Sequence, residues 1–291
     1  MDYKGKTAVI TGAASGLGRG IARACASRGM NLVLADINSP RLHEIGQELS
    51  SSGLEVLTLA ADVAEVDDME RLAYLAFERF GAVHLLFNNA GVLGEVSILD
   101  AMLRDWEWIM GVNLWGVVHS IRAFVPRMLE SGEAGRVVNI AGTAGFLSGP
   151  GVGIYRMTKH AVVSLTESLY HELALLDSKV RVSVVSPAFV RTDIMASEIN
   201  RPPKMQCFAR TAAVNPVEEA VIGHFHQQVE TAPEPEDVAE TIFSGIDKNK
   251  FYIFTPALSQ AQSSRAGIQG RLESIMEERN PVIMSLLKHT I

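Results

Sequence analysis

The sequence predicts a single doubly wound α/β domain whose seven-stranded parallel sheet carries helices on both faces. Short apolar, β-branched runs alternate with longer segments of helical periodicity up to about residue 255. A glycine-rich turn directly follows the first of these runs, and an acidic residue ends the second, as in open doubly wound sheets. With 291 residues, 47% of them hydrophobic, the chain is long enough for one large core.

The composition argues against several classes of protein. A formal net charge of −7 disfavours a nucleic-acid partner. No apolar run approaches the ~18 residues of a membrane span, and the N-terminus does not resemble a secretory signal. Cys25 and Cys207 are far apart, and no H-E-x-x-H pattern or Cys/His cluster occurs, so we expect neither a disulfide framework nor a catalytic metal. We therefore expect a cytoplasmic protein without a membrane or nucleic-acid partner.

The first predicted strand, Lys6 to Thr11, leads directly into the turn GAASGLG and a helix over Arg19 to Arg28, which Gly29 ends. This arrangement can point backbone N–H groups and a helix N-terminus at a pyrophosphate. The spacing is G-x-x-x-G-x-G, and a tight turn that only requires small residues is the alternative interpretation. The candidate dinucleotide-binding residues of this turn are Gly12, Ser15, Gly16, Leu17 and Gly18.

Asp36 ends the second predicted strand, Asn31 to Ala35, close to the ~20 residues after the turn at which an acidic residue meets the adenosine ribose. A carboxylate there accepts hydrogen bonds from both ribose hydroxyls and repels a 2′-phosphate. No Arg or Lys stands in the turn or directly after Asp36, so the sequence favours NAD over NADP. The alternative is that Asp36 only ends a strand.

The next segments repeat the alternation of helix and strand. A helix begins with Ser39 as its N-cap and Pro40 at its first position, and a third strand covers Leu54 to Ala61. Asp62 and Val63 follow, where the aspartate either touches the adenine or caps the next helix. The elements after them are a helix over about Asp67 to Phe80, a strand over Val83 to Phe87, the turn-forming run Asn88-Asn89-Ala90-Gly91, and a long helix over Met102 to Met128.

The helix predicted over Gly151 to Leu176 carries the candidate chemistry. Tyr155 and Lys159 are four residues apart and therefore share one face. An ammonium beside a phenol favours the phenolate and lowers a pKa that is otherwise about 10, so we expect Tyr155 to exchange protons nearer neutral pH. Taken alone, such a pair is more often a half-buried surface contact. The buried face predicted for this helix consists of Ile154, Met157, Ala161, Val162, Leu165, Leu169, Leu173 and Leu176.

The chain resembles the short-chain dehydrogenase/reductase family over roughly residues 4 to 255. The motifs that carry the resemblance occur in the family's order and spacing, and they are TGAASGLG, Asp36, NNAG and the Tyr155/Lys159 pair. The resemblance implies a strand order of 3-2-1-4-5-6-7 and a NAD-dependent interconversion of a secondary alcohol and a ketone. It implies that Tyr155 is the acid or base, that Lys159 also holds the nicotinamide ribose, and that Asn113 holds a water near Lys159. A homodimer or homotetramer is expected on the same ground. The further cofactor contacts that it implies are Asn89, Gly91, Pro187, Val190 and Thr192.

Gly142, after the fifth predicted strand Gly135 to Ala141, departs from the family, because the active-site serine would fall on it. The hydroxyl of Thr143 is expected to point elsewhere, since side chains alternate near a strand end. Three interpretations stay open: Thr143 or a water replaces the lost donor, Gly142 makes room for a bulky substrate, or the chain is a disabled variant. Two further functions therefore remain alternatives, a NAD-binding regulator with little turnover and an NADP-dependent ketone reductase.

The remaining chain completes the domain. A sixth strand covers Lys179 to Ser186, a helix Pro235 to Ile246, and a seventh strand Phe251 to Thr255. Residues 193–230 correspond to the family's substrate lid, and residues 256–291 are expected to be a helical extension of the same domain. We expect a bulky, hydrophobic or aryl substrate from the apolar side chains gathered in and near the lid. These are Leu93, Phe146, Phe189, Ile194, Met195, Ile199, Met205, Phe208 and Val214.

Overall fold

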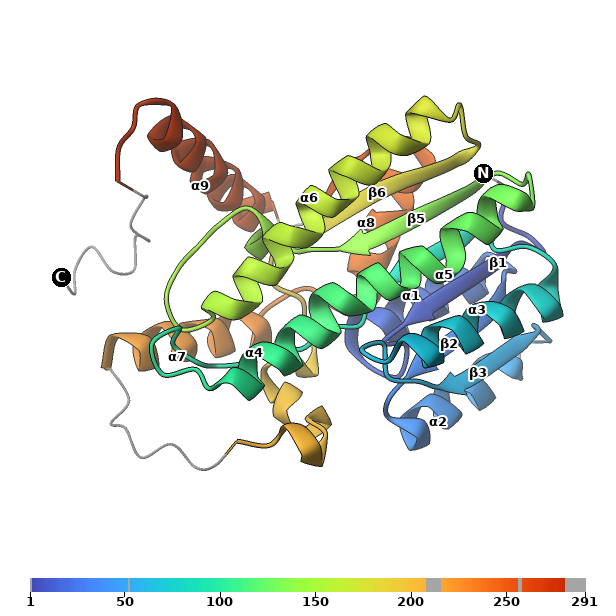
Figure 1. Ribbon diagram of the computed structural model, residues 1–291, viewed down its shortest axis with the longest axis horizontal. Helices are drawn as coiled ribbons and strands as arrows, with labels where there is room; N and C mark the ends of the chain where they lie inside the picture. The colour runs from blue at the N-terminus through green and yellow to red at the C-terminus, as the bar shows by residue number, and fades with distance from the viewer. Residues whose placement is uncertain (1, 52, 208–215, 256–257, 281–291) are drawn as a thin grey trace.

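The computed structural model describes residues 2–51, 53–207, 216–255 and 258–280. All seven strands pair in parallel, in the predicted order β3-β2-β1-β4-β5-β6-β7 (Figure 1). The strands are β1 (Thr7–Thr11), β2 (Asn31–Asp36), β3 (Val56–Ala60), β4 (Leu85–Asn88), β5 (Gly135–Ile140), β6 (Val180–Pro187) and β7 (Tyr252–Thr255). The order reverses between β1 and β4, which is where open α/β sheets bind their ligands.

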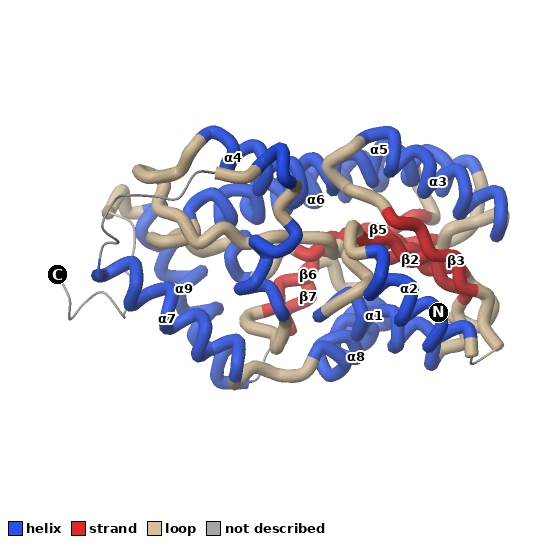
Figure 2. The backbone as a smooth tube through the Cα atoms, turned by 90° about the horizontal axis from the view of Figure 1, so that it is seen from below, coloured by secondary structure: helices blue, strands red, loops and turns tan. Residues whose placement is uncertain are grey.

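Helices cover both faces of the sheet, so the fold has three layers and forms one domain (Figure 2). On one face lie α1 (Gly16–Ser27), α2 (Ser39–Ser50) and α8 (Pro235–Asp247), whose core includes the fully buried Phe87 and Phe243. On the other face lie α3 (Val66–Phe80), α5 (Gly116–Glu130) and α6 (Gly153–Leu175), packed around Phe124. The remaining described helices are α4 (Leu103–Met110), α7 (Pro216–Glu230) and α9 (Leu258–Met276).

Two helix predictions need correction. The helix expected over Met102 to Met128 is interrupted by a π-helical turn, η1 (Gly111–Trp115), between α4 and α5. Such turns are frequent at functional sites, and this one contains Asn113. The N-cap of α2 is Asn38 and not Ser39, because the Asn38 side chain accepts a hydrogen bond from the backbone N–H of Arg41 at 3.2 Å.

The buried stripe of α6 was predicted only in part. Met157 and Leu176 are exposed, whereas Thr158 and Thr166 are fully buried. The polar residues are buried because α6 packs against both the sheet and the α4–η1 segment, where each threonine has a partner. Thr166 accepts a hydrogen bond from Asn139 at 2.9 Å, and Thr158 accepts one from Asn113 at 3.3 Å.

The segment predicted as a lid contains the short helices η3 (Asp193–Asn200) and η4 (Pro203–Met205), followed by α7. Phe208, Val214 and the last eleven residues, 281–291, lie outside the described residues. Within the described part of the chain, no helix combines the length and apolarity needed to cross a bilayer. The same residues contain no cluster of three or more His, Cys, Asp or Glu side chains that could hold a metal ion.

Candidate active site

A cleft of about 500 Å³ lies at the carboxyl ends of the central strands. It brings together residues from the glycine turn, from the ends of β2, β4, β5 and β6, from α6 and from the lid segment. The residues predicted for catalysis and for cofactor binding all line this cleft, except Gly18 and Asn113.

The glycine turn is packed too closely for side chains. Gly12 and Gly16 have φ angles of +65° and +48°, and a Cβ on Gly18 would lie 2.0 Å from the Gly12 carbonyl oxygen. Asn89 supports this turn, because its Nδ2 donates to the carbonyl oxygens of Thr11 and Gly12 at 2.9 and 3.2 Å. The wall is therefore bare backbone at a helix N-terminus, which suits the pyrophosphate of a dinucleotide.

Asp36 is fixed at the end of β2. Its Oδ2 accepts a hydrogen bond from the N–H of Ala14 at 3.0 Å, and its Oδ1 accepts one from Asn38 at 2.8 Å. Burial raises the pKa of the Asp36 carboxyl, and these backbone donors oppose the shift. Each carboxylate oxygen keeps a lone pair for a ribose hydroxyl.

A basic residue does lie near this end of the cleft, contrary to our reading of the sequence. Arg41 of α2 lines the same wall as Asp36, and its charge opposes the rise of the Asp36 pKa. The sequence rule failed because one helical turn brings position 41 back toward the strand end. The Arg41 Nη1 pairs with Asp193 Oδ2 of the lid segment at 3.0 Å, so its charge is already balanced by a carboxylate.

The other predicted cofactor contacts also meet at the cleft wall. Asp62 and Val63 follow β3, and the Asp62 Oδ1 accepts a hydrogen bond from the Ala64 N–H at 3.0 Å. Pro187 and Val190 line the opposite side, together with Thr192. The Thr192 side chain closely approaches Gly16, where a Cβ would lie only 2.8 Å from its methyl carbon.

Tyr155 and Lys159 share one face of α6, as predicted, with the Lys159 Nζ 5.7 Å from the centre of the Tyr155 ring. The expected lowering of the Tyr155 pKa is wrong for this structure. Burial raises the pKa of the Tyr155 phenol to about 12, opposed only by the charge of Arg156. Burial also lowers the pKa of Lys159 to about 8, and its Nζ donates to the Ile140 carbonyl oxygen at 2.9 Å. Desolvation is the main cause of both shifts, because it disfavours the charged form of each group.

Asn113 acts on the cleft through the backbone of Val92. Its Oδ1 accepts from the Val92 N–H at 2.8 Å, and its Nδ2 donates to the Val92 carbonyl oxygen at 2.9 Å. The side chain is fully buried, and a Cβ placed on Gly91 would lie 3.4 Å from Lys159 Nζ and 3.5 Å from Asn113 Oδ1. The π-helical turn thus holds the segment after β4 beside the lysine.

Gly142 and Thr143 both line the cleft. Gly142 has a φ of +77°, and a Cβ built on it would lie 4.0 Å from the Tyr155 hydroxyl oxygen. The backbone therefore turns at this glycine and begins a 3₁₀ turn, η2 (Thr143–Gly145), which ends the strand alternation one residue early.

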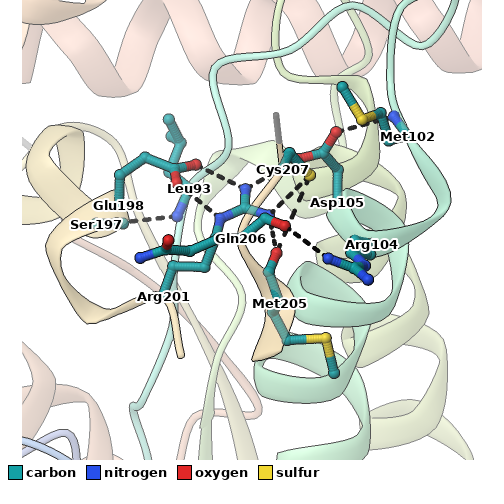
Figure 3. Close-up of polar contacts among 10 residues, drawn as sticks. All are labelled: Leu93, Met102, Arg104, Asp105, Ser197, Glu198, Arg201, Met205, Gln206 and Cys207. Carbon is teal, nitrogen blue, oxygen red and sulfur yellow. Dashed lines mark hydrogen bonds and ion pairs between the residues drawn. The ribbon is translucent and has the colours of Figure 1, made fainter. Parts of the chain in front are cut away.

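The lid segment is held to α4 by a buried ion-pair cluster that the sequence did not reveal (Figure 3). Arg201 Nη2 pairs with Asp105 Oδ1 at 2.9 Å, and Nε pairs with Glu198 at 2.7 Å. The guanidinium also lies over the Trp108 ring at 4.1 Å. The Arg201 and Asp105 side chains are 4% and 0% exposed, so removing either partner would leave a buried charge without its counter-ion.

The substrate end of the cleft is largely apolar. Leu93, Phe189, Ile194, Met195 and Ile199 line it, as predicted. Phe146 packs instead against Phe254, and Met205 packs against the core cluster around Trp108. The lining residues that the sequence analysis missed here include Trp108, Val152, Arg156, Phe225 and Val229.

The sheet, the glycine turn and the Tyr155/Lys159 helix define a nicotinamide dinucleotide-dependent oxidoreductase. The family model described as short chain dehydrogenase matches residues 6–202. The chain therefore belongs to the short-chain dehydrogenase/reductase family, as the sequence motifs indicated.

Three relatives illustrate the similarity. A short-chain dehydrogenase/reductase from Burkholderia phymatum, solved in complex with NAD, is 40% identical with a TM-score of 0.90, over 98% of this chain and 99% of that one. The CLA biosynthesis dehydrogenase/reductase of Lactiplantibacillus plantarum is 36% identical over 87% of this chain and 89% of its own. The cyclohexanol dehydrogenase of an Acinetobacter species is 35% identical over 67% of this chain and 76% of its own.

Proposed function

We propose that the protein is a NAD-dependent oxidoreductase that interconverts a bulky, apolar secondary alcohol and its ketone. The observation that carries this proposal is that one cleft holds the glycine turn, Asp36, Tyr155 and Lys159. The cyclohexanol dehydrogenase and the NAD complex among its relatives support the reaction class and the cofactor. Apolar side chains at the substrate end support the substrate class.

The residues of the cleft fit a dinucleotide. In this proposal the glycine turn holds the pyrophosphate, Asp36 holds the adenosine ribose, and Lys159 holds the nicotinamide ribose. When bound, NAD would accept hydride from the alcohol carbon, and NADH would return it to the ketone. The fixed carboxylate of Asp36 supports NAD over NADP, because it would repel a 2′-phosphate.

Tyr155 exchanges the proton with the substrate oxygen. With a pKa near 12 its phenol is protonated at neutral pH, so ketone reduction can draw on it directly as the acid. Alcohol oxidation requires the phenolate, and a cationic Lys159 assists its formation. Because the Lys159 pKa lies near 8, we expect this assistance to weaken as the pH rises through that value.

Thr143 is our candidate for the donor that the family's serine would supply. It lines the cleft directly after Gly142, and its hydroxyl has no hydrogen bond to another described residue. Losing one such donor typically costs ~10²–10³-fold in rate. Thr143→Val should therefore lower kcat by that factor while leaving NADH affinity unchanged, and a kcat within a few-fold of the unmodified protein would exclude this role.

The test of the function combines an NADH titration with turnover on a panel of aromatic and alicyclic ketones. Tyr155→Phe should abolish turnover while NADH affinity stays within about two-fold, because the hydroxyl is the proton donor and the ring keeps its packing. Retained turnover in Tyr155→Phe would remove Tyr155 from its role. NADH binding without turnover on any ketone would favour the second candidate, a NAD-binding regulator, which the absence of a serine at Gly142 supports. The oligomeric state and the cytoplasmic location stay predictions.

A further inference from the structure

Arg156 is a half-buried cation on the wall of the candidate active site. It directly follows Tyr155 on α6, and both residues line the cleft. Its Nη1 donates to the Leu147 carbonyl oxygen at 2.8 Å, and its guanidinium carbon lies 5.7 Å from the centre of the Phe225 ring. These two contacts hold the side chain against the substrate end of the cleft.

The remaining donors of this guanidinium are unused. Nε is buried without a hydrogen-bond acceptor, and Nη2 donates to no other described residue. Among the residues that the structure describes, no carboxylate pairs with Arg156, whereas Arg23, Arg28 and Arg201 each have at least one. Nη2 is not among the enclosed atoms, so it is the donor that a carboxylate in the cleft can reach.

We propose that Arg156 binds a carboxylate of the substrate through the Nη2 of its guanidinium, so that the preferred substrates are apolar hydroxy and keto acids. This inference rests on the proposed function and names the substrate class within it. A cation without a counter-ion is costly inside a protein, and the cost is recovered when a ligand brings the opposite charge. Burial accordingly lowers the pKa of Arg156.

The surroundings of Arg156 favour an amphipathic acid over a small polar one. The cleft wall beyond it is formed by Val152, Phe225, Val229 and Phe189, which offer apolar contacts to the rest of the substrate. The other cations of the cleft have other partners: Lys159 is assigned to the nicotinamide ribose, and Arg41 pairs with Asp193. Arg156 is therefore the cation in the described cleft that a substrate anion can pair with.

The first experiment compares acids with their esters in the unmodified protein. Benzoylpropionic acid, its longer-chain homologues and their methyl esters have the same ketone but differ in one charge. We expect the acids to have KM values at least ~10-fold lower than their esters, with similar kcat, because a charge-assisted hydrogen bond adds ~1.5–3 kcal/mol of binding. An ester preference, or equal KM values across the series, would overturn the proposal.

The second experiment uses Arg156→Gln, Arg156→Lys and Arg79→Gln. Arg156→Gln should raise KM for the acids ~10-fold or more and leave KM for the esters unchanged. Arg156→Lys, which keeps the charge without the guanidinium, should be intermediate and also guards against misfolding of the glutamine variant. Arg79→Gln is the matched control, because Arg79 is exposed and paired only with Glu55. An equal loss for acids and esters would assign Arg156 a structural role.

A binding measurement separates this proposal from the proposed function. Calorimetric titration of benzoylpropionic acid into the NADH-saturated protein needs no turnover. Binding that is lost in Arg156→Gln supports the carboxylate site even if no ketone is reduced. If NADH binds and the ketone esters are reduced but no acid binds, the carboxylate site is wrong and the proposed function stands. If NADH itself does not bind, the proposed function is wrong, and the carboxylate site that rests on it is wrong as well.

Discussion

Gly142 combines a strained backbone with free space, and this combination makes its replacement informative. Its φ of +77° lies in the left-handed region that disfavours any residue with a Cβ. A Cβ built there would nevertheless meet no heavy atom closer than 3.5 Å, the carbonyl oxygen of Pro187. Gly142→Ala and Gly142→Ser should therefore fold, and both should lose stability through the backbone and not through a clash.

The expected loss can be worked out from these numbers. The left-handed conformation costs ~1–2 kcal/mol for a residue with a side chain. Unfolding entropy of ~2.1 cal/mol/K per residue gives about 0.6 kcal/mol/K for a chain of 291 residues, so Tm should fall by about 2–3 °C. Calorimetry on both variants measures this shift, which should be the same for Ala and Ser. An unchanged Tm in both would refute the argument from backbone strain.

The difference between the two variants tests the chemistry. A Ser hydroxyl at position 142 would project from a Cβ 4.0 Å from the Tyr155 oxygen, within reach of the substrate oxygen. With Thr143 present, Gly142→Ser and Gly142→Ala should have kcat values within a few-fold of each other. In a Thr143→Val background, Ser should exceed Ala by ~10²–10³-fold, because it restores the missing donor. A hundred-fold advantage of Ser while Thr143 is intact would show that Thr143 does not serve as that donor.

Three other predictions address the cofactor, the π-helical turn and the lysine. Asp36→Ala should weaken NAD binding far more than NADP binding in fluorescence titrations, and equal effects would overturn the cofactor preference. Asn113→Ala should destabilise the protein by about 2–6 kcal/mol in urea unfolding, because it leaves both polar backbone groups of Val92 buried without partners; a loss below ~1 kcal/mol would contradict this. Lys159 has a folded-state pKa of about 8, below its ordinary value of 10.5, so between these values the unfolded chain binds more protons and stability rises with pH. Relative to Lys159→Met, the unmodified protein should therefore gain about 2 kcal/mol between about pH 7.5 and about pH 9.5, and a parallel pH dependence of the two proteins would refute the shift.

The sequence was sufficient for the fold because each element carries its own local signal. The β-branched run of β1, the positive-φ Gly29 after α1 and the apolar period of α3 all act within a few residues of one another. The strand order followed from the resemblance and from the doubly wound pattern. The π-helical turn at Gly111–Trp115 was not predictable, because the hydrophobic period continues across it and the extra residue is stabilised by the distant Val92.

The sequence predicted the parts of the candidate site that local backbone structure determines. It did not predict the parts that depend on the burial and contacts of charged side chains. The glycine turn and Asp36 are fixed by their own strands and turns, so spacing alone located them. The direction of the Tyr155 pKa was wrong because burial, which spacing does not report, is the largest cause of its shift. Arg41 and Arg156 were missed for a related reason, since helical periodicity does not say which polar residues face a cleft.

The two ends of the cleft are held by different kinds of interaction, and this difference bears on specificity. At the dinucleotide end, the Asn89 side chain donates hydrogen bonds to the backbone of the glycine turn, at the ends of β4 and β1. Substitutions there therefore disturb the fold itself. At the substrate end, the lid segment is attached by side chains, chiefly through the Arg201–Asp105 pair. Substitutions in the apolar lid or at Arg156 can therefore change which alcohol is accepted while the dinucleotide end stays intact. Specificity should accordingly depend on α6, α7 and the lid segment, where we propose that the half-buried guanidinium of Arg156 selects an acid.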